Sequence, residues 1–409
     1  MKRFCRAAAC ALIAVMLVAM SAALYMQVTL PDDYLVVAGE DIHFDYPVSM
    51  VKAEGTAQPE VYNSPGNSYK VDIKLAGAIQ IKTVEINVVD RKMVMVSGEP
   101  MGIKMFTDGL MVVGASDVVS GGQRVNPAKA AGIQVGDILL AFNGAKLNGN
   151  EGLASMMEKN GGSPITFTVQ RGESTFAATV TPALSDGDQK YRLGVWVRDS
   201  SAGIGTMTYY DLNSGLFAGL GHAVCDVDTG DIMPLSGGEI VSAEVTGCRK
   251  GENGSPGELK GRFISGETVG TLLANTSSGV YGTVRSRNIM AGEQMPVALR
   301  HEVRAGKATI RTTIEGTDVQ EYEIEIEKVT LADYTKGQNM VIRITDPELL
   351  EKTGGIVQGM SGSPILQNGM LVGAVTHVFV NDPTRGFGIF AENIDAGAQT
   401  TLNRVREIA

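Results

Sequence analysis

The chain has few of the residues that staple small domains together. Its 409 residues include four cysteines, of which Cys5 and Cys10 lie in an N-terminal apolar segment. A chain this long can build a sufficient core without disulfides, so Cys225 and Cys248 are open to either reading, as a bridge or as free thiols. Two cysteines without a nearby pair of histidines do not form a zinc site. We therefore expect no metal and no cofactor.

Positive charge is also scarce. The net charge is −10, and no basic stripe interleaved with aromatic residues occurs, which argues against a nucleic-acid partner. Hydrophobic residues at 44% and charged residues at 20% describe an ordinary globular protein. Long helical patterns are few, whereas fifty glycines and many Val, Ile and Thr runs are present. These features predict a mainly β chain of two or three domains.

The N-terminus predicts export. Three basic residues precede the uncharged run Ala7–Met26, which is long enough to span a bilayer. Residues 1–26 are therefore expected to be a signal or anchor segment, and whether it is cleaved is left open. The excess of positive charge before the run places Pro31 onward on the far side of the membrane.

Residues 27–98 alternate apolar and polar positions between Gly, Pro and Asn turns. This pattern predicts a small β region. It contains no combination of residues suited to catalysis, so we expect a structural or docking module.

Residues 99–185 have the pattern of a bacterial PDZ domain. Asn126–Leu139 contains Pro-Ala-x-x-Ala-Gly-apolar-x-x-Gly-Asp-x-apolar, which predicts a short helix and then a strand. Met101, Gly102 and Ile103 resemble the loop in which PDZ domains capture a peptide carboxylate with backbone N–H groups. PDZ domains add a peptide strand to a sheet edge. The domain is expected to recognise a protein tail or internal strand, with an inert domain held against its neighbour as the alternative.

Residues 186–409 contain many short strands separated by Gly-rich turns, which predicts a sandwich or barrel. Within them, Gly359–Pro364 reads Gly-x-Ser-Gly-Ser-Pro and resembles the nucleophile loop of chymotrypsin-like serine peptidases. The backbone N–H groups of Gly359 and Ser361 could form an oxyanion hole beside the Ser361 hydroxyl. The alternative is a Gly/Ser-rich turn without chemistry.

A serine nucleophile needs a base, and the chain has four histidines. His222 lies in Gly-Leu-Gly-His-Ala-Val, 139 residues before Ser361, in the order and at an interval comparable with chymotrypsin-like enzymes. His43 lies outside the predicted barrel, His301 is expected on a solvated strand face, and His377 is expected as a wall or core residue. His222 is the predicted base.

The third catalytic group is less well defined by the sequence. Asp346 precedes Pro347 and Glu348, a pattern typical of a helix N-cap. The acidic run that starts at Asp226 lacks the glycine and glutamate that an EF-hand needs at its sixth and twelfth places. One of its carboxylates could instead orient His222.

Together these motifs resemble the SpoIVB-type (stage IV sporulation protein B) peptidases of endospore-forming bacteria. The resemblance rests on Gly221–His222, Asp226–Gly230, Gly254–Glu258, Asp346–Pro364 and Gly373–Pro383. It implies a PDZ domain followed by a chymotrypsin-like double β-barrel, and a triad of His222, Asp346 and Ser361. The short interval between Asp346 and Ser361 departs from chymotrypsin-like enzymes.

The resemblance also implies a role. Such peptidases are exported into the space between the forespore and mother-cell membranes, where they cleave a membrane-bound regulator of sigma-factor processing. They also cleave themselves, so a second copy is an expected partner. The alternatives are a catalytically inactive PDZ scaffold and an HtrA-like envelope quality-control protease, although in the latter the peptidase precedes the PDZ domain.

Overall fold

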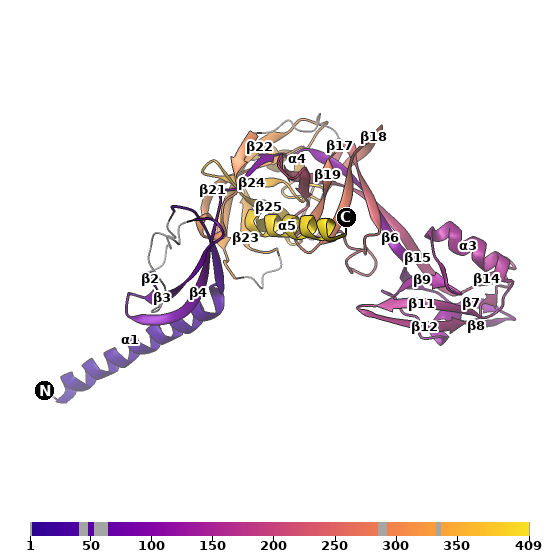
Figure 1. Ribbon diagram of the computed structural model, residues 1–409, viewed down its shortest axis with the longest axis horizontal. Coiled ribbons are helices and arrows are strands. Elements are labelled where there is room, and N and C mark those ends of the chain that lie inside the picture. Colours follow the sequence, from indigo (N-terminus) through magenta and orange to yellow (C-terminus); the bar gives the residue numbers. More distant parts are fainter. Residues whose placement is uncertain (1, 41–47, 53–63, 285–292, 333–336, 409) are drawn as a thin grey trace.

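The computed structural model describes residues 2–40, 48–52, 64–284, 293–332 and 337–408 (Figure 1). His43 lies outside these residues. The described chain is mainly β and consists of a small N-terminal sheet, two β-barrels and an α+β lobe. The predicted fold class, a chymotrypsin-like double barrel with a PDZ domain and an N-terminal β region, is confirmed.

The N-terminal part consists of a long helix and a four-stranded sheet. Helix α1 (Lys2–Thr29) projects away from the molecule, and its last turns pack Ala23 and Met26 against the sheet (Figure 1). The sheet has the order β1-β4-β3-β2, with strands β1 (Asp33–Val37), β2 (Val48–Lys52), β3 (Ser68–Leu75) and β4 (Ile79–Val89). Among the described residues, no helix combines the length and the apolar character that crossing a bilayer requires.

The first barrel closes through six strands of the described chain, in the order β6-β17-β18-β19-β16-β15 and back to β6. The strands are β6 (Pro100–Ala115), β15 (Val195–Tyr210), β16 (Leu216–Gly219), β17 (Gly237–Arg249), β18 (Glu258–Thr276) and β19 (Gly279–Val284). Met105, Phe217 and Ile240 are fully buried in its core. Strand β5 (Met93–Val96) pairs with β15 and with β20 (Glu293–Pro296), so it belongs to this sheet and not to the N-terminal region.

The second barrel is closed in the order β21-β22-β23-β26-β25-β24. Its strands are β21 (Gly306–Thr312), β22 (Gln320–Val329), β23 (Met340–Ile344), β24 (Pro364–Gln367), β25 (Met370–Phe379) and β26 (Asp382–Phe390). Alternate residues such as Ile324, Ile326, Ile342 and Ile344 point into its core. Helix α4 (Pro347–Thr353) leads into β24, and α5 (Ala391–Ile408) packs on strands of both barrels (Figure 1).

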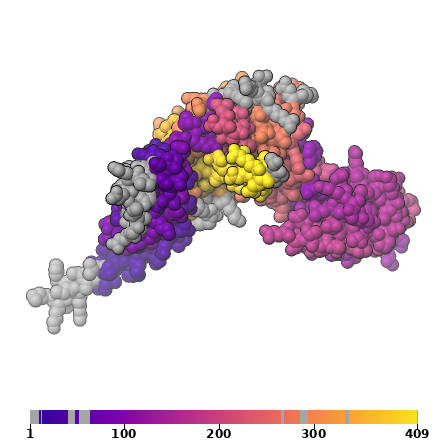
Figure 2. Space-filling view, in the orientation of Figure 1, coloured from indigo at the N-terminus to yellow at the C-terminus, as the bar shows by residue number. Residues whose placement is uncertain are grey.

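The PDZ lobe emerges from within the first barrel. Strands β6 and β15, of 16 residues each, pair along their length and carry the chain out of the barrel and back (Figure 1). Figure 2 shows the lobe set apart from the barrels. It contains β7 (Val118–Ser120), β8 (Gln123–Val125), α2 (Pro127–Ala130), β9 (Ile138–Phe142), β10 (Ala145–Lys146), α3 (Gly149–Asn160), β11 (Ile165–Arg171), β12 (Ser174–Val180), β13 (Ala183–Leu184) and β14 (Tyr191–Arg192).

The predicted boundaries at residues 99 and 186 therefore divide the first barrel. Residues 101–106 of β6 pair with β17 inside the barrel, before the PDZ lobe begins. The sequence shows no break at this point, because β6 is one continuous strand that serves both units.

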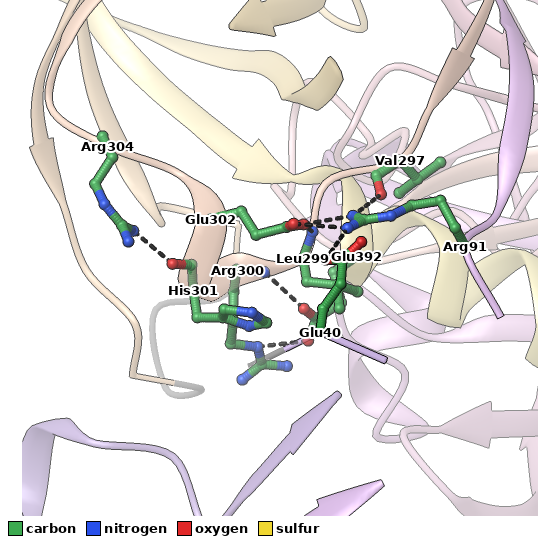
Figure 3. A network of polar contacts seen from close by, with 9 residues as sticks. All are labelled: Glu40, Arg91, Val297, Leu299, Arg300, His301, Glu302, Arg304 and Glu392. Atoms are coloured by element: carbon green, nitrogen blue, oxygen red, sulfur yellow. Dashed lines mark hydrogen bonds and ion pairs between the residues drawn. The ribbon is translucent and has the colours of Figure 1, made fainter. Parts of the chain in front are cut away.

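An ionic network joins the start of the chain to the double barrel (Figure 3). Arg91 donates to both carboxylate oxygens of Glu302, at 2.7 and 2.8 Å, and to Glu40 at 2.6 Å. Arg300, one residue from His301, donates to Glu392 at the start of α5. His301 itself is buried in the 3-10 helix η2 (Arg300–Glu302), so the prediction of a solvated strand face was wrong. Its Nδ1 has no hydrogen-bond partner among the described residues.

His301 should make the fold sensitive to acid. The pKa of His301 is lowered from 6.5 to about 4, chiefly by burial; Glu302 and Glu40 raise it, whereas Arg304 and Arg91 lower it. The unfolded chain therefore binds this proton more tightly, and stability from a neutral His301 is present above pH 6.5 and lost towards pH 4. We expect wild-type stability to fall by up to ~3 kcal/mol from this residue between pH 7 and pH 4.

The test is denaturant unfolding of wild type and His301→Leu across that range. Wild type should lose stability relative to His301→Leu as the pH falls, so the free energy of unfolding of wild type minus that of the variant should decrease by up to ~3 kcal/mol. Parallel curves for the two proteins would contradict this account of His301.

Candidate active site

The predicted nucleophile loop connects α4 to β24 and is held by the first barrel. Gly359 and Gly362 have φ angles of +101° and +94°, which favour glycine. Thr206 on β15 donates its N–H to the Ser361 carbonyl at 3.0 Å and its hydroxyl to the Gly359 carbonyl at 2.8 Å. Thr208, two residues later, donates to the Gly362 carbonyl at 2.8 Å. These hydrogen bonds fix the loop at the junction of the two barrels.

Ser361 has the surroundings that a nucleophile needs. Its hydroxyl is half-buried and donates to the Thr376 carbonyl on β25 at 2.8 Å. Within the described chain, the N–H groups of Gly359 and Ser361 donate to no acceptor, whereas that of Gly362 donates to Val375. Two unengaged N–H groups in the loop that carries the nucleophile are what an oxyanion hole requires.

His222 lies three residues after β16 and contacts β25, the strand that also accepts the Ser361 hydroxyl. Leu220 and Gly221 both have positive φ angles, which turn the chain sharply before the imidazole. The His222 ring stacks on His377, with centroids 4.7 Å apart, and His377 directly follows Thr376. The turn before His222 lies against the nucleophile loop, since a Cβ at Gly362 would lie 2.5 Å from the Leu220 nitrogen. Among the described residues, no hydrogen bond joins the His222 ring to the Ser361 hydroxyl.

The tautomer of His222 follows from its hydrogen bond. Its Nδ1 lies 2.8 Å from the Ala223 carbonyl oxygen, which can only accept, so Nδ1 carries a proton and Nε2 is free to accept one. Burial lowers the pKa of His222 below its ordinary value, although the bond to Ala223 opposes this. Burial and the neighbouring His222 also lower the pKa of His377. Both rings are neutral near pH 7, as a general base must be.

Two residues that sequence reasoning missed hold the His222 loop. Asn275, at the end of β18, accepts from Val224 N–H at 2.8 Å and donates to the Val224 and Met233 carbonyls at 2.9 and 3.0 Å. Arg198, on the part of β15 that reaches the PDZ lobe, pairs with the fully buried Asp226 carboxylate and with Asp228. Neither residue lies in a recognisable motif, because each acts on a segment far away in sequence.

Among the described residues, no hydrogen bond joins Asp346 to His222. It is the N-cap of α4, and its carboxylate accepts the N–H groups of Glu348 and Leu349 at 2.9 and 3.0 Å. Gly337, before β23, lies near the turn that precedes His222: a Cβ there would lie 3.7 Å from the Gly221 carbonyl oxygen. Asp346 follows β23, and a five-residue strand spans roughly 17 Å. The geometry favours the cap over the triad member.

The alternative carboxylates are also occupied elsewhere. Asp226 accepts from Asp228 and Thr229 N–H groups as well as from Arg198, and Asp231 lies against the PDZ turn at Gly136. In the described chain, no carboxylate contacts His222, and the Ala223 carbonyl is the group that orients it.

We expect Asp346→Asn to leave both stability and peptidase activity near wild type, since asparagine is an equally good N-cap. Asp346→Ala should cost about 1 kcal/mol of stability through loss of the cap. Thermal denaturation and initial cleavage rates of the two variants provide the check. A large loss of activity in Asp346→Asn with an unchanged melting temperature would show that Asp346 is a catalytic residue after all.

The predicted carboxylate-binding loop was wrong. Met101, Gly102 and Ile103 lie within β6, where β15 pairs with one edge and β17 with the other. Met101 and Ile103 are buried in the core of the first barrel. Their backbone groups lie in these two ladders and are not arranged as a loop.

The PDZ helix faces a different segment. Helix α3 contacts β14 and β15, and Asp199 on β15 accepts the N–H of Asn150 at the start of α3 at 2.8 Å. Between β14 and β15 lies Leu193-Gly194, with Gly194 at a φ of +82°. Sequence reasoning missed this turn because the polar run Ser185–Gln189 before it was interpreted as the boundary between the PDZ domain and the peptidase domain.

Cys225 and Cys248 are free thiols in the structure. Burial raises the pKa of both, so neither is an activated nucleophile.

Comparison with known proteins adds the following. A family described as SpoIVB peptidase S55 matches residues 189–394, and one described as PDZ domain matches residues 101–181. A curated relative, "Putative zinc metalloprotease BH06270" of Bartonella henselae, is 30% identical over 100 residues, which are 24% of this chain and 27% of that protein. The chain thus spans about a quarter of that relative's length.

Two solved structures also match. "HtrA-type protease AlgW with decapeptide" has a TM-score of 0.30 and 14% identity, covering 54% of this chain and 59% of that one. A thermostable serine protease, AL20, from an extremophilic microorganism has a TM-score of 0.29 and 14% identity, covering 49% and 92%. The match over residues 189–394 includes His222, Asn275, Asp346 and Ser361. The chain belongs to the SpoIVB peptidase S55 family of serine peptidases and carries a PDZ domain.

Proposed function

We propose that the protein is a serine endopeptidase in which Ser361 is the nucleophile and His222 the base. Ser361 Oγ attacks the substrate carbonyl while His222 Nε2 takes its proton, and the Gly359 and Ser361 N–H groups stabilise the oxyanion. His222 then protonates the leaving amine, and water hydrolyses the acyl-enzyme. The observation that carries the proposal is the contact between the Ser361 loop, which has two unengaged N–H groups, and the turn that leads to His222.

The pH dependence of wild-type cleavage tests this proposal. Because the base must be unprotonated and burial lowers its pKa, kcat/KM should stay high at pH 6.5 and fall only at lower pH. Initial rates on a fluorogenic peptide from pH 4.5 to 8 give the profile. An acid limb centred well above pH 6.5 would contradict His222 as the base.

We further propose that the biological substrate is a membrane-bound regulatory protein of sporulation, and that the protein also cleaves itself. Support comes from the family match and from the PDZ lobe, whose helix α3 flanks strand β15. Incubation of the full chain alone should release fragments, and Ser361→Ala should not. Fragmentation that continues in Ser361→Ala would remove self-cleavage from the proposal.

Export across the cytoplasmic membrane is part of the same proposal. It rests on the basic residues followed by the apolar run Ala7–Met26. A fused alkaline phosphatase, which needs an oxidising compartment to form its disulfides, should be active with the segment and inactive without it. Equal phosphatase activity in both fusions would contradict export through this segment.

A further inference from the structure

A cavity of about 220 Å³ is lined by residues of the first barrel and by one residue of the second. It is bounded by β6, β15, β17 and β18 and by Thr317, in the connection between β21 and β22. Most of its walls are apolar, as with Met207 and Val269. Its polar side chains come from Glu99, Ser242 and Thr317, and none of the described residues that line it is Lys, Arg or His.

Glu99 is a half-buried carboxylate without a partner. Among the described residues, no hydrogen bond or ion pair reaches its side-chain oxygens, and burial raises its pKa to about 7. Other buried carboxylates in this chain are paired: Asp137 with Arg171, and Asp226 with Arg198. An unpaired carboxylate in an apolar cavity is costly in free energy and favours a cation beside it.

The cavity wall is attached to the nucleophile loop. Met207 donates its N–H to the Glu99 carbonyl at 3.0 Å. The preceding residue, Thr206, donates hydrogen bonds to the Ser361 and Gly359 carbonyls. On the other side, Val245 and Gly316 exchange backbone hydrogen bonds of 2.8 Å, which dock the Thr317 connection on β17. The cavity wall and the nucleophile loop are therefore connected through two adjacent residues of β15, Thr206 and Met207.

We propose that this cavity binds a lysine or arginine side chain of the peptide substrate, close to the scissile bond, with Glu99 as its counter-ion. The inference rests on the proposed peptidase function, because it names the substrate class of that site. The aliphatic stem packs against Met207 and Val269 while the charged end meets Glu99. The volume lies below the roughly 300–1,000 Å³ of small-molecule sites, which suits one side chain.

The first test measures cation binding without catalysis. Butylguanidinium, which mimics the arginine side chain, is titrated into the full chain carrying Ser361→Ala, and the neutral pentanol serves as comparison. Because Glu99 ionises near pH 7, binding should be about tenfold tighter at pH 8 than at pH 6. Adding Glu99→Gln should abolish it.

The matched control is Glu244→Gln. Glu244 lies on β17 like the cavity wall, but its carboxylate pairs with Arg262 at 2.6 Å and does not line the cavity. This variant should bind butylguanidinium as the parent does. Equal binding to Glu99→Gln and to the parent, measured by calorimetry, would overturn the proposal.

The second test identifies what uses the cavity. In a peptide library digested by the active full chain, lysine and arginine should be enriched at least fivefold at one fixed position relative to the cut. Glu99→Gln should lose this enrichment and Glu244→Gln should keep it. Enrichment that survives Glu99→Gln overturns the proposal. If neither the active protein nor its variants cleave any peptide, the proposed peptidase function is wrong, and so is the proposed role of the cavity in substrate binding. The titration with butylguanidinium still shows in that case whether the cavity binds a cation.

Discussion

Ser361→Ala is expected to lower the rate of peptide cleavage by about 10⁴–10⁶-fold, since no other hydroxyl can attack from this position. His222→Ala should lower it by a similar factor, because Ser361 then has no base to take its proton. The double variant should be no worse than either single variant, as expected of two groups that act as one unit. Initial rates of peptide cleavage by the purified full chain measure all three.

Ser363→Ala is the matched control for Ser361→Ala. Ser363 lies two residues further along, is fully buried, and donates its hydroxyl to Thr312 at 2.9 Å. Its loss should cost about 1 kcal/mol of stability and leave cleavage intact. Activity that resists Ser361→Ala but disappears in Ser363→Ala would show that the wrong serine has been assigned.

Gly362→Ala should be more damaging than Gly359→Ala, whose Cβ would meet only side-chain atoms of Leu259. Gly362 has a φ of +94°, and a Cβ there would lie 2.1 Å from the Thr206 carbonyl oxygen and 2.5 Å from the Leu220 nitrogen. Both atoms are backbone and cannot give way without moving β15 or the turn before His222. We expect a loss of more than ~3 kcal/mol in stability and of ~10²-fold in activity.

Gly369→Ala isolates the effect of the backbone angle. Gly369 has a φ of +75° but open space around it, in the turn between β24 and β25. Its substitution should cost about 1 kcal/mol, from strain alone, and leave the rate unchanged. Equal losses in Gly362→Ala and Gly369→Ala, measured by denaturant unfolding, would contradict the contact between the loop and Thr206.

The nucleophile and base could be predicted from the sequence because their signals are local. The glycines around Ser361 and those before His222 report tight turns, and such turns expose a functional group whatever lies around them. Strands β22 and β23 could also be predicted, because their apolar residues alternate with polar ones and each strand has one face in the barrel core.

The rest depended on contacts between distant residues. Thr206 and Asn275 are ordinary strand residues until the fold brings them to Ser361 and to the His222 loop. At Asp346 the local signal was informative. The sequence pattern predicted a helix N-cap, whereas the family resemblance implied a member of the triad. In the structure Asp346 is the N-cap of α4. The prediction of a carboxylate-binding loop at Gly102 was wrong because β6 continues through this residue and pairs with a strand on each edge.

Covalent labelling with a fluorophosphonate, followed by mass spectrometry, tests the central assignment most directly. This reagent reacts with a serine hydroxyl only when a base and an oxyanion hole activate it. The account predicts one modified residue, Ser361, labelled much more slowly in His222→Ala and at the wild-type rate in Asp346→Asn. Modification of a different serine, or an undiminished rate in Ser361→Ala, would contradict it.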